Sequence, residues 1–355
     1  MSELLFPSDN AAGLSAEVME ALARADRGAA LPYGNDDLTS RVNELYSAFF
    51  EHPVFVFPTA TGTAANALAL AAVTPPYGEI LCHSRAHVLT TEGGAPEFYT
   101  GGARLVGLDC EDGLITVDAF SSNLAGRTPS KHHLRLAAIS LTQATEVGTV
   151  YRPTDVATLA ERAHAHEMKV HMDGARLANA LVALDVTPAQ MTWQCGVDVL
   201  SLGTTKNGTL NAEAVIAFDR DMARDIAYRH KRAGLLVSKM RYVAAQLIAY
   251  LEQDLWARNA RRANRAAARL ARIFAALPGA RLRHRVETNQ VFVELPSPLV
   301  AMLDHANIRF REWLPGNPPV YRLVTSFQTT DADIQRVADV FGAAFPQASR
   351  FGELH

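Results

Sequence analysis

Apolar runs of strand length alternate with helical stretches over the first two thirds of the chain, and this order constrains the fold most. The apolar runs are 54–57, 79–83, 104–108, 136–141, 168–173, 197–202 and 213–218. Helical stretches between them include 63–73, 153–166 and 177–184. Such alternation is typical of βαβ units, which build a mainly parallel sheet with helices on both faces. We therefore predict an α/β fold whose large domain holds a mainly parallel seven-stranded sheet.

The character of the chain changes in its last third. Residues 220–277 have a helical pattern without a strand signal. Short strand-like runs then mix with helical stretches, at 280–283, 291–295, 298–305, 321–325 and 331–345. This mixture predicts a small α+β domain at the C-terminal end. We place the large domain, with its N-terminal segment, at 1–250 and the small domain at 251–355.

Composition excludes several classes of protein. A net charge of −3 implies no general affinity for nucleic acid or for anionic membranes. Hydrophobic residues make up 48% of the 355 residues, which excludes a disordered chain. Three widely spaced cysteines indicate reduced thiols rather than a disulfide framework. With no secretory signal in MSELLFPSDN and no apolar run long enough to span a bilayer, we expect a soluble cytoplasmic protein.

A carboxylate and a lysine follow two neighbouring predicted strands. The segment HMDGAR ends one strand at Asp173, and VDVLSLGTTKNG delivers Lys206 after the next. Pyridoxal phosphate chemistry needs both groups, because a lysine forms the Schiff base and a carboxylate keeps the ring nitrogen protonated. Either residue alone is more often a helix cap or a surface lysine. Their order and spacing favour an enzyme that uses this cofactor to act on amino acids.

A candidate phosphate site precedes the helical stretch 63–73. Thr61, Gly62 and Thr63 stand where the helix begins, and a helix N-terminus offers free N–H groups and a favourable dipole to an anion. Gly62 lets the anion approach the backbone. The alternative is an ordinary threonine-capped helix, which the downstream Asp173 and Lys206 make the weaker interpretation. GTTK is not a nucleotide-binding P-loop, because it lacks the glycine framing and the final Ser or Thr of that pattern.

Two histidines lie close together at positions 83 and 87. The segment HSRAH lacks the glutamate of the zinc motifs, so we predict no metal site. We expect His87 to stack on the pyridine ring and His83 to be structural. Glu92, before Gly93, either supports His87 or caps a helix.

These motifs together resemble those of the low-specificity L-threonine aldolases, in the aspartate-aminotransferase-like (fold type I) group of pyridoxal phosphate enzymes. The resemblance covers nearly the whole chain and is carried by SDN (8–10), YGND (33–36), TGTAAN (61–66), AHVLTTEGG (86–94), QATEVGTVY (143–151), HMDGAR (171–176), GTTKNG (203–208) and YRLVTSF (321–327). Asn10 stands where the family commonly has threonine, and GTTKNG differs from the Ser-Lys-Gly-Leu of other members.

The resemblance implies cleavage of a β-hydroxy-α-amino acid, such as threonine, allo-threonine or phenylserine, to glycine and an aldehyde. It implies that Arg322 and Arg176, with Ser8, hold the α-carboxylate, since arginine offers a planar bidentate fork. His87, or a water that it positions, is the candidate base for the β-hydroxyl proton, and His133 is a second candidate.

The resemblance also implies a homotetramer, or a homodimer, with active sites at subunit interfaces. Tyr33 and the basic run 230–234 then reach a neighbour's site, although a solvated helix face explains that run equally well.

Other functions share parts of this pattern. A β-eliminating lyase, a racemase or an aminotransferase uses the same aspartate and lysine. A cofactor-free binding protein or a nicotinamide oxidoreductase could share an α/β sheet, but the chain lacks the G-x-G-x-x-G that follows the first strand of nicotinamide-binding folds.

Overall fold

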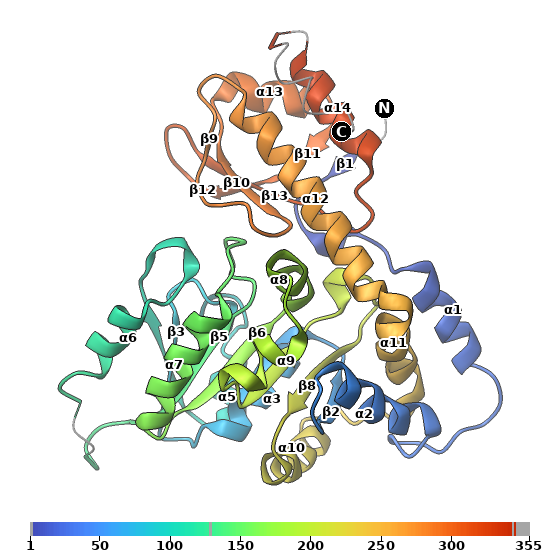
Figure 1. Cartoon of the computed structure of the whole chain (residues 1–355), viewed down its shortest axis with the longest axis vertical. Coiled ribbons are helices and arrows are strands. Elements are labelled where there is room, and N and C mark those ends of the chain that lie inside the picture. The colour runs from blue at the N-terminus through green and yellow to red at the C-terminus, as the bar shows by residue number, and fades with distance from the viewer. Residues whose placement is uncertain (1–2, 128–129, 343, 346–355) are drawn as a thin grey trace.

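A seven-stranded sheet forms the centre of the computed structural model, which describes residues 3–127, 130–342 and 344–345. The strand order is β2-β8-β7-β6-β5-β3-β4, and Figure 1 shows this sheet below the C-terminal part. Their bounds are Phe55–Thr59 (β2), Gly78–His83 (β3), Arg104–Leu108 (β4), Arg135–Thr142 (β5), Lys169–Gly174 (β6), Val199–Leu202 (β7) and Glu213–Ala217 (β8). Each lies within about two residues of a predicted strand, and the predicted α/β class is confirmed.

Strand direction in this sheet is mainly parallel. The pairs β7-β6, β6-β5, β5-β3 and β3-β4 are parallel, whereas β8 runs antiparallel to both β7 and β2. Every residue of β3, β7 and β8 is buried. Parallel strands with both faces covered read as continuous apolar runs rather than alternating ones, which is why the sequence revealed them.

Helices cover both faces of the sheet. In β7, Val199 packs with α3 (Gly62–Val73) and α10 (Arg220–Arg232), whereas Leu200 packs in the larger core on the opposite face. That larger core includes residues of α2 (Asp37–Phe49), α7 (Pro153–Ala165), α8 (Leu177–Leu184) and α11 (Arg241–Leu251). Successive strand residues point to opposite faces, so one strand joins the two cores.

The C-terminal part has its own antiparallel sheet and core. The order β12-β13-β10-β9 joins Arg311–Leu314 (β12), Val320–Val324 (β13), Gln290–Glu294 (β10) and Arg281–Leu282 (β9). Helices α13 (Ser297–His305) and α14 (Asp331–Gly342) pack there; residue 343 of the predicted helix lies outside the described residues. The short β12 and β11 (Ile308–Arg309) were not among our predictions.

Two segments connect this part to the large sheet. The 21-residue helix α12 (Leu255–Ala275) contacts α8 and α11 and also carries residues of the C-terminal core (Figure 1). At the other end of the chain, β1 (Leu4–Leu5) pairs with β11, and Phe6 is buried in the same core. The N-terminal strand therefore packs with the C-terminal part, although we assigned it to the large domain. A division at residue 250 remains a prediction.

The remaining helices are short or lie at the N-terminal end. They are α1 (Ala16–Ala25), α4 (His87–Thr90), α5 (Ala95–Thr100), α6 (Val117–Leu124) and α9 (Pro188–Met191). Within the described residues, no helix has both the length and the apolar character needed to cross a membrane.

Candidate active site

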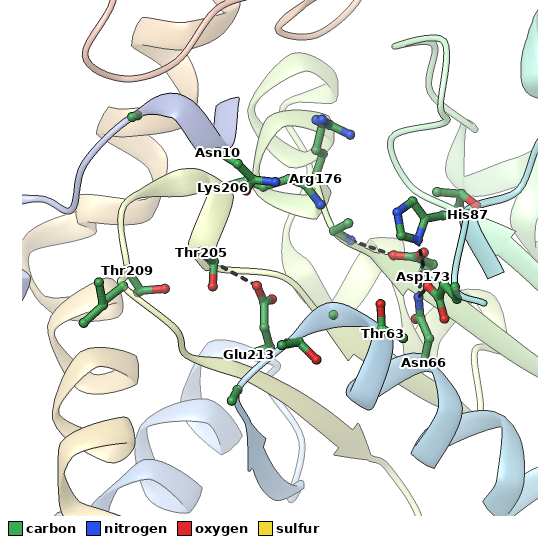
Figure 2. Close-up of a pocket in the computed structure, with 18 of the residues that line it drawn as sticks. Asn10, Thr63, Asn66, His87, Asp173, Arg176, Thr205, Lys206, Thr209 and Glu213 are labelled. Atoms are coloured by element: carbon green, nitrogen blue, oxygen red, sulfur yellow. Dashed lines mark hydrogen bonds and ion pairs between the residues drawn. The ribbon is translucent and has the colours of Figure 1, made fainter. Parts of the chain in front are cut away.

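One cavity of about 570 Å³ opens where the parallel strands β5, β6 and β7 end (Figure 2). Ligands of open α/β sheets bind at the carboxyl ends of the strands, because the loops there can present side chains to a common space. Its lining includes Asn10, Thr61, Gly62, Thr63, Asn66, His87, Glu92, Thr142, Glu146, Asp173, Arg176, Thr205, Lys206 and Glu213. The structure thus brings together the predicted aspartate, lysine, histidine and phosphate loop.

Close contact between two loops fixes the aspartate relative to the lysine. Asp173 lies near the end of β6, and Lys206 lies in a 3-10 turn (Thr205–Asn207) just after β7. Between them, a Cβ atom on Gly203 would come within 2.5 Å of Ala175 Cα, so only glycine allows the loops to lie this close. The spacing of the two reacting positions is therefore set by backbone packing.

A glycine after the lysine also fixes its turn. Gly208 has a φ of +120°, and a Cβ atom there would stand 2.3 Å from Ser15 Oγ and 2.6 Å from Asn259 Nδ2. Asn259, on α12, donates hydrogen bonds to Ser15 Oγ and to the Asn207 carbonyl. The long helix α12 thus anchors the turn that carries Lys206.

The Asp173 carboxylate is buried and accepts two hydrogen bonds. Its Oδ1 accepts from the Ala175 N–H at 3.0 Å, and its Oδ2 accepts from Asn66 Nδ2 at 3.0 Å. Asn66 comes from α3, so it ties the helix behind the phosphate loop to the carboxylate (Figure 2). A carboxylate held in this way can pair with a protonated ring nitrogen in the cavity.

His87 is joined to the aspartate through two intervening side chains. Its Nδ1 lies 2.8 Å from Glu92 Oε1, and that oxygen also accepts from Asn66 Nδ2 at 2.8 Å. The hydrogen bond to Glu92 raises the pKa of His87. Burial in turn raises the pKa of Glu92. Glu92 therefore supports His87, which decides between the two roles that the sequence left open.

His83 is structural, as expected. Its Nδ1 accepts the Arg85 N–H at 3.1 Å and its Nε2 lies 3.0 Å from the Cys110 carbonyl. Both ring nitrogens are therefore occupied by the backbone. The described residues contain no group of three or more His, Cys, Asp or Glu side chains that could hold a metal ion.

The N-terminus of α3 faces the cavity with free space in front of it. Thr61 caps the helix through its hydroxyl, which accepts the Ala64 N–H at 3.1 Å. A Cβ atom on Gly62 would meet nothing within 4 Å. Open space at the dipole end of a helix, with the N–H groups of Gly62 and Thr63 beside it, fits the phosphate of the predicted cofactor.

Arg176 lines the cavity, but two of the three nitrogens of its guanidinium already donate hydrogen bonds within the protein. Its Nε and Nη2 donate to the buried Asp9 carboxylate at 2.7 and 3.0 Å, and Asn289 Nδ2 donates to the same carboxylate at 3.1 Å. Burial opposes ionisation of Asp9, yet the charges of Arg176 and Lys206 outweigh it and hold the pKa of Asp9 below its usual value. Asp9 was missed in our prediction, although it lies between Ser8 and Asn10 of a motif that we used.

Arg322 lies close to this pair, although it is not among the lining residues. Its Nη2 donates to the Pro7 carbonyl at 3.0 Å, and its guanidinium stands over the Trp313 ring at 5.1 Å. Its buried Nε has no partner among the described residues. Burial, together with the charge of Arg176, lowers the pKa of Arg322 to about 10, which marks a cation short of anionic partners.

Besides Arg322, three predicted site residues lie outside the cavity lining of their own chain. The Ser8 hydroxyl accepts the Asn10 N–H at 3.2 Å and caps a short turn. Tyr33 is 47% exposed, with Lys231 Nζ over its ring at 4.7 Å. His133 is exposed and precedes β5, so it stands at the opposite edge of the sheet, roughly 25 Å from the cavity. The structure thus separates His133 from the site it was predicted to serve.

Two further acidic residues line the cavity and were not predicted. Glu213 begins β8, and its Oε2 accepts the Thr204 N–H at 3.0 Å, beside the lysine turn. Glu146 follows β5 in the segment QATEVGTVY. A single acidic residue within an otherwise apolar or small-residue stretch was the signal available in both cases.

This fold and this cavity define a pyridoxal phosphate enzyme of fold type I. The sequence profile of the beta-eliminating lyases matches residues 6–297. The chain therefore belongs to the beta-eliminating lyase family.

Individual relatives agree with this family. The chain is 41% identical to a low specificity L-threonine aldolase of Pseudomonas aeruginosa, over 94% of this chain and 95% of that one. A second such aldolase, from a Pseudomonas species, is 37% identical over the same shares. The solved threonine aldolase of Leishmania major superimposes with a TM-score of 0.88 at 25% identity, covering 96% of this chain and 99% of that one. The similarity extends over both the large sheet and the C-terminal part.

Proposed function

We propose that the protein is a pyridoxal phosphate-dependent aldolase that cleaves L-threonine, L-allo-threonine or a related β-hydroxy-α-amino acid, such as phenylserine, to glycine and an aldehyde. The observation that carries this proposal is the convergence of Lys206, Asp173 and His87 on one cavity. The threonine aldolases to which the chain is similar support the same reaction.

The cofactor would be held by residues already described. Lys206 binds it covalently, Asp173 pairs with the ring nitrogen, and the loop 61–63 receives the phosphate. When bound, pyridoxal phosphate supplies an electron-accepting ring that stabilises negative charge at the substrate's Cα. The role of Asn66 is to donate to Asp173 Oδ2 and so to hold that carboxylate in its orientation.

Arg322 and Arg176 would bind the α-carboxylate of the substrate. Arg322 has no carboxylate partner among its hydrogen bonds in the described residues, whereas Arg176 has given two of its three nitrogens to Asp9. The principal contact therefore falls to Arg322, and Arg176 adds charge and its remaining Nη1. Ser8 shapes this corner through its turn. Fixing the carboxylate orients Cα so that the Cα–Cβ bond can break.

His87, or a water that it positions, is the candidate base for the β-hydroxyl proton. Its Nδ1 is engaged by Glu92, so Nε2 is the nitrogen left for the ligand or for a water. The raised pKa of His87 means that the imidazole keeps its proton to higher pH, and a base must be neutral to act. If His87 is the base, cleavage rises as the pH increases through that pKa.

The proposed enzyme is a homotetramer, or a homodimer, with shared active sites. Tyr33 and His133 lie outside their own cavity, so either can serve a site only in a second copy of the chain. Leu210 supports this arrangement, because it lines the cavity and is also 54% exposed. A fully active monomer in sedimentation analysis would exclude it.

The three unpaired cysteines fit a reducing compartment such as the cytoplasm, where we propose that the enzyme works.

Product analysis with phenylserine tests the aldolase. We expect benzaldehyde and glycine in equal amounts, without a keto-acid acceptor. Ammonia and a keto acid would favour β-elimination, a requirement for an acceptor would indicate an aminotransferase, and epimerisation alone a racemase. If His87→Asn remained fully active, the assignment as an aldolase would stand. The base would then be another group of the cavity.

A further inference from the structure

Glu146 is a carboxyl group of the cavity wall to which the proposed function has given no role. Its Oε1 accepts the His87 main-chain N–H at 2.8 Å and the Thr142 hydroxyl at 3.0 Å. Its Oε2 is buried and has no partner among the described residues. Because Oε2 is shielded, the carboxyl can exchange a proton with the cavity only through Oε1, and the side chain bound to Oε1 is Thr142.

Thr142 lines the cavity beside Glu146 and is hydrogen-bonded to it. It is the last residue of β5, and it lines the cavity together with Glu146 and Asp173. A hydroxyl both donates and accepts, so Thr142 can accept a hydrogen bond from the cavity while it donates to Glu146. Thr142 and Glu146 together therefore form a path along which a proton can move away from the ligand.

We propose that the β-hydroxyl proton of the substrate passes to Thr142 Oγ while the Thr142 proton passes to Glu146 Oε1, with His87 holding the site in place rather than accepting the proton. This inference rests on the proposed aldolase reaction. As the O–H bond breaks, the carbonyl of the aldehyde forms and the Cα–Cβ electron pair moves to Cα. One proton then returns to Cα to complete glycine, so no other reactant is consumed.

The electrostatic surroundings of Glu146 suit a proton acceptor near neutral pH. Burial, and then the negative charge of Asp173, raise the pKa of Glu146 to about 7. The other titratable groups facing it are His87, Cys82 and Tyr151. Burial raises the pKa of Cys82 to about 12 and that of Tyr151 still further above its usual value, so both stay protonated. General bases work best with a pKa near the working pH.

The sign of the pH dependence follows from these groups. An acceptor must be ionised, so kcat/KM for phenylserine should rise as the pH increases through about 7 and level off above it. Glu146→Gln should remove this rise and lower kcat by about 10²–10⁴-fold. Glutamine suits the test because its oxygen can still accept from both the His87 N–H and the Thr142 hydroxyl. The scaffold around His87 is thereby retained.

A second measurement separates proton transfer from structure. Exchange of the glycine α-hydrogen with deuterium oxide needs the cofactor and Lys206 but involves no β-hydroxyl. We expect Glu146→Gln to exchange glycine within about threefold of the wild-type rate, because this reaction does not use the proposed path for the β-hydroxyl proton. Thr142→Val should lose cleavage as Glu146→Gln does, and Thr142→Ser, which restores a hydroxyl, should recover most of the lost rate.

Glu97 supplies the matched control. It also has a buried, unpartnered carboxylate oxygen, but it lies on α5 outside the cavity. Glu97→Gln should keep both the cleavage rate and the pH profile. The inference is overturned if Glu146→Gln loses glycine exchange as fully as cleavage, or if the pH rise persists in Glu146→Gln and disappears in His87→Asn. Absence of benzaldehyde from the wild-type protein would instead refute the proposed function.

Discussion

Gly62 allows the proposed phosphate site to be tested by two effects of opposite sign. It is the first residue of α3, its φ is not positive, and a Cβ atom there would meet nothing within 4 Å. Replacing a glycine by alanine without strain stabilises a protein by about 0.4–1 kcal/mol, because the unfolded chain loses freedom. Gly62→Ala should therefore stabilise the cofactor-free protein by an amount within that range.

The same methyl group would stand in the space that the phosphate needs. Displacing the anion from one charge-assisted hydrogen bond costs about 1.5–3 kcal/mol, which corresponds to roughly ten- to a hundredfold weaker cofactor binding. Urea unfolding of the cofactor-free protein measures the first effect, and an absorbance titration with pyridoxal phosphate measures the second. If Gly62→Ala bound the cofactor as tightly as the wild-type protein, the assignment of the phosphate to this loop would be refuted. If Gly62→Ala were less stable than the wild-type protein, the space beside Gly62 would not be free for a methyl group.

Thr61→Ala is the matched control for that experiment. It removes the hydroxyl that caps the Ala64 N–H, and loss of such a cap costs about 0.5–2 kcal/mol. We expect it to destabilise the cofactor-free protein, which shows that the unfolding assay can resolve changes at this helix end in either direction.

Three further substitutions test the other site residues. Lys206→Ala should lose the visible absorption of the lysine-bound cofactor and nearly all turnover; a failure of borohydride to label any lysine in the wild-type protein would contradict the covalent link. Asp173→Asn should lower turnover by about 10²–10³-fold while weakening cofactor retention far less, because an amide cannot hold the ring nitrogen protonated. An unchanged rate would leave Asp173 as a helix cap. Arg322→Lys should raise KM for threonine by about ten- to a hundredfold, since a point charge does not replace a bidentate fork; an unaffected KM would assign the carboxylate to Arg176 alone.

Local sequence signals predicted the central sheet and several of the residues that line its cavity. Its strands are apolar and bounded by glycine, polar residues or helical stretches, so each could be recognised by itself. Asp173, Lys206 and Gly62 were found because chain order places them at strand or helix ends, and such ends meet at one edge of a parallel sheet.

Local sequence signals could not predict contacts between segments that are distant in the sequence. The partner of Arg176 is Asp9, 167 residues away, so the sequence could not show that the fork of Arg176 was already engaged. His133 looked suitable because of its residue type, yet it precedes β5, whereas Glu146 follows the same strand and reaches the cavity. The end of the strand that a residue occupies therefore determines whether it reaches the cavity of its own chain.

The hydrogen bonds of Asp9 join parts of the chain that lie far apart in the sequence. Asp9 joins Arg176 across 167 residues and Asn289 across 280, while β1 reaches β11 near the other end of the chain. Contacts this distant in sequence carry a large loop-closure entropy and form late. The hydrogen bonds around Asp9 therefore cannot all form before Asn289 has been synthesised. A ligand that binds only the folded form, as we propose for pyridoxal phosphate, stabilises that form relative to incompletely folded ones by mass action.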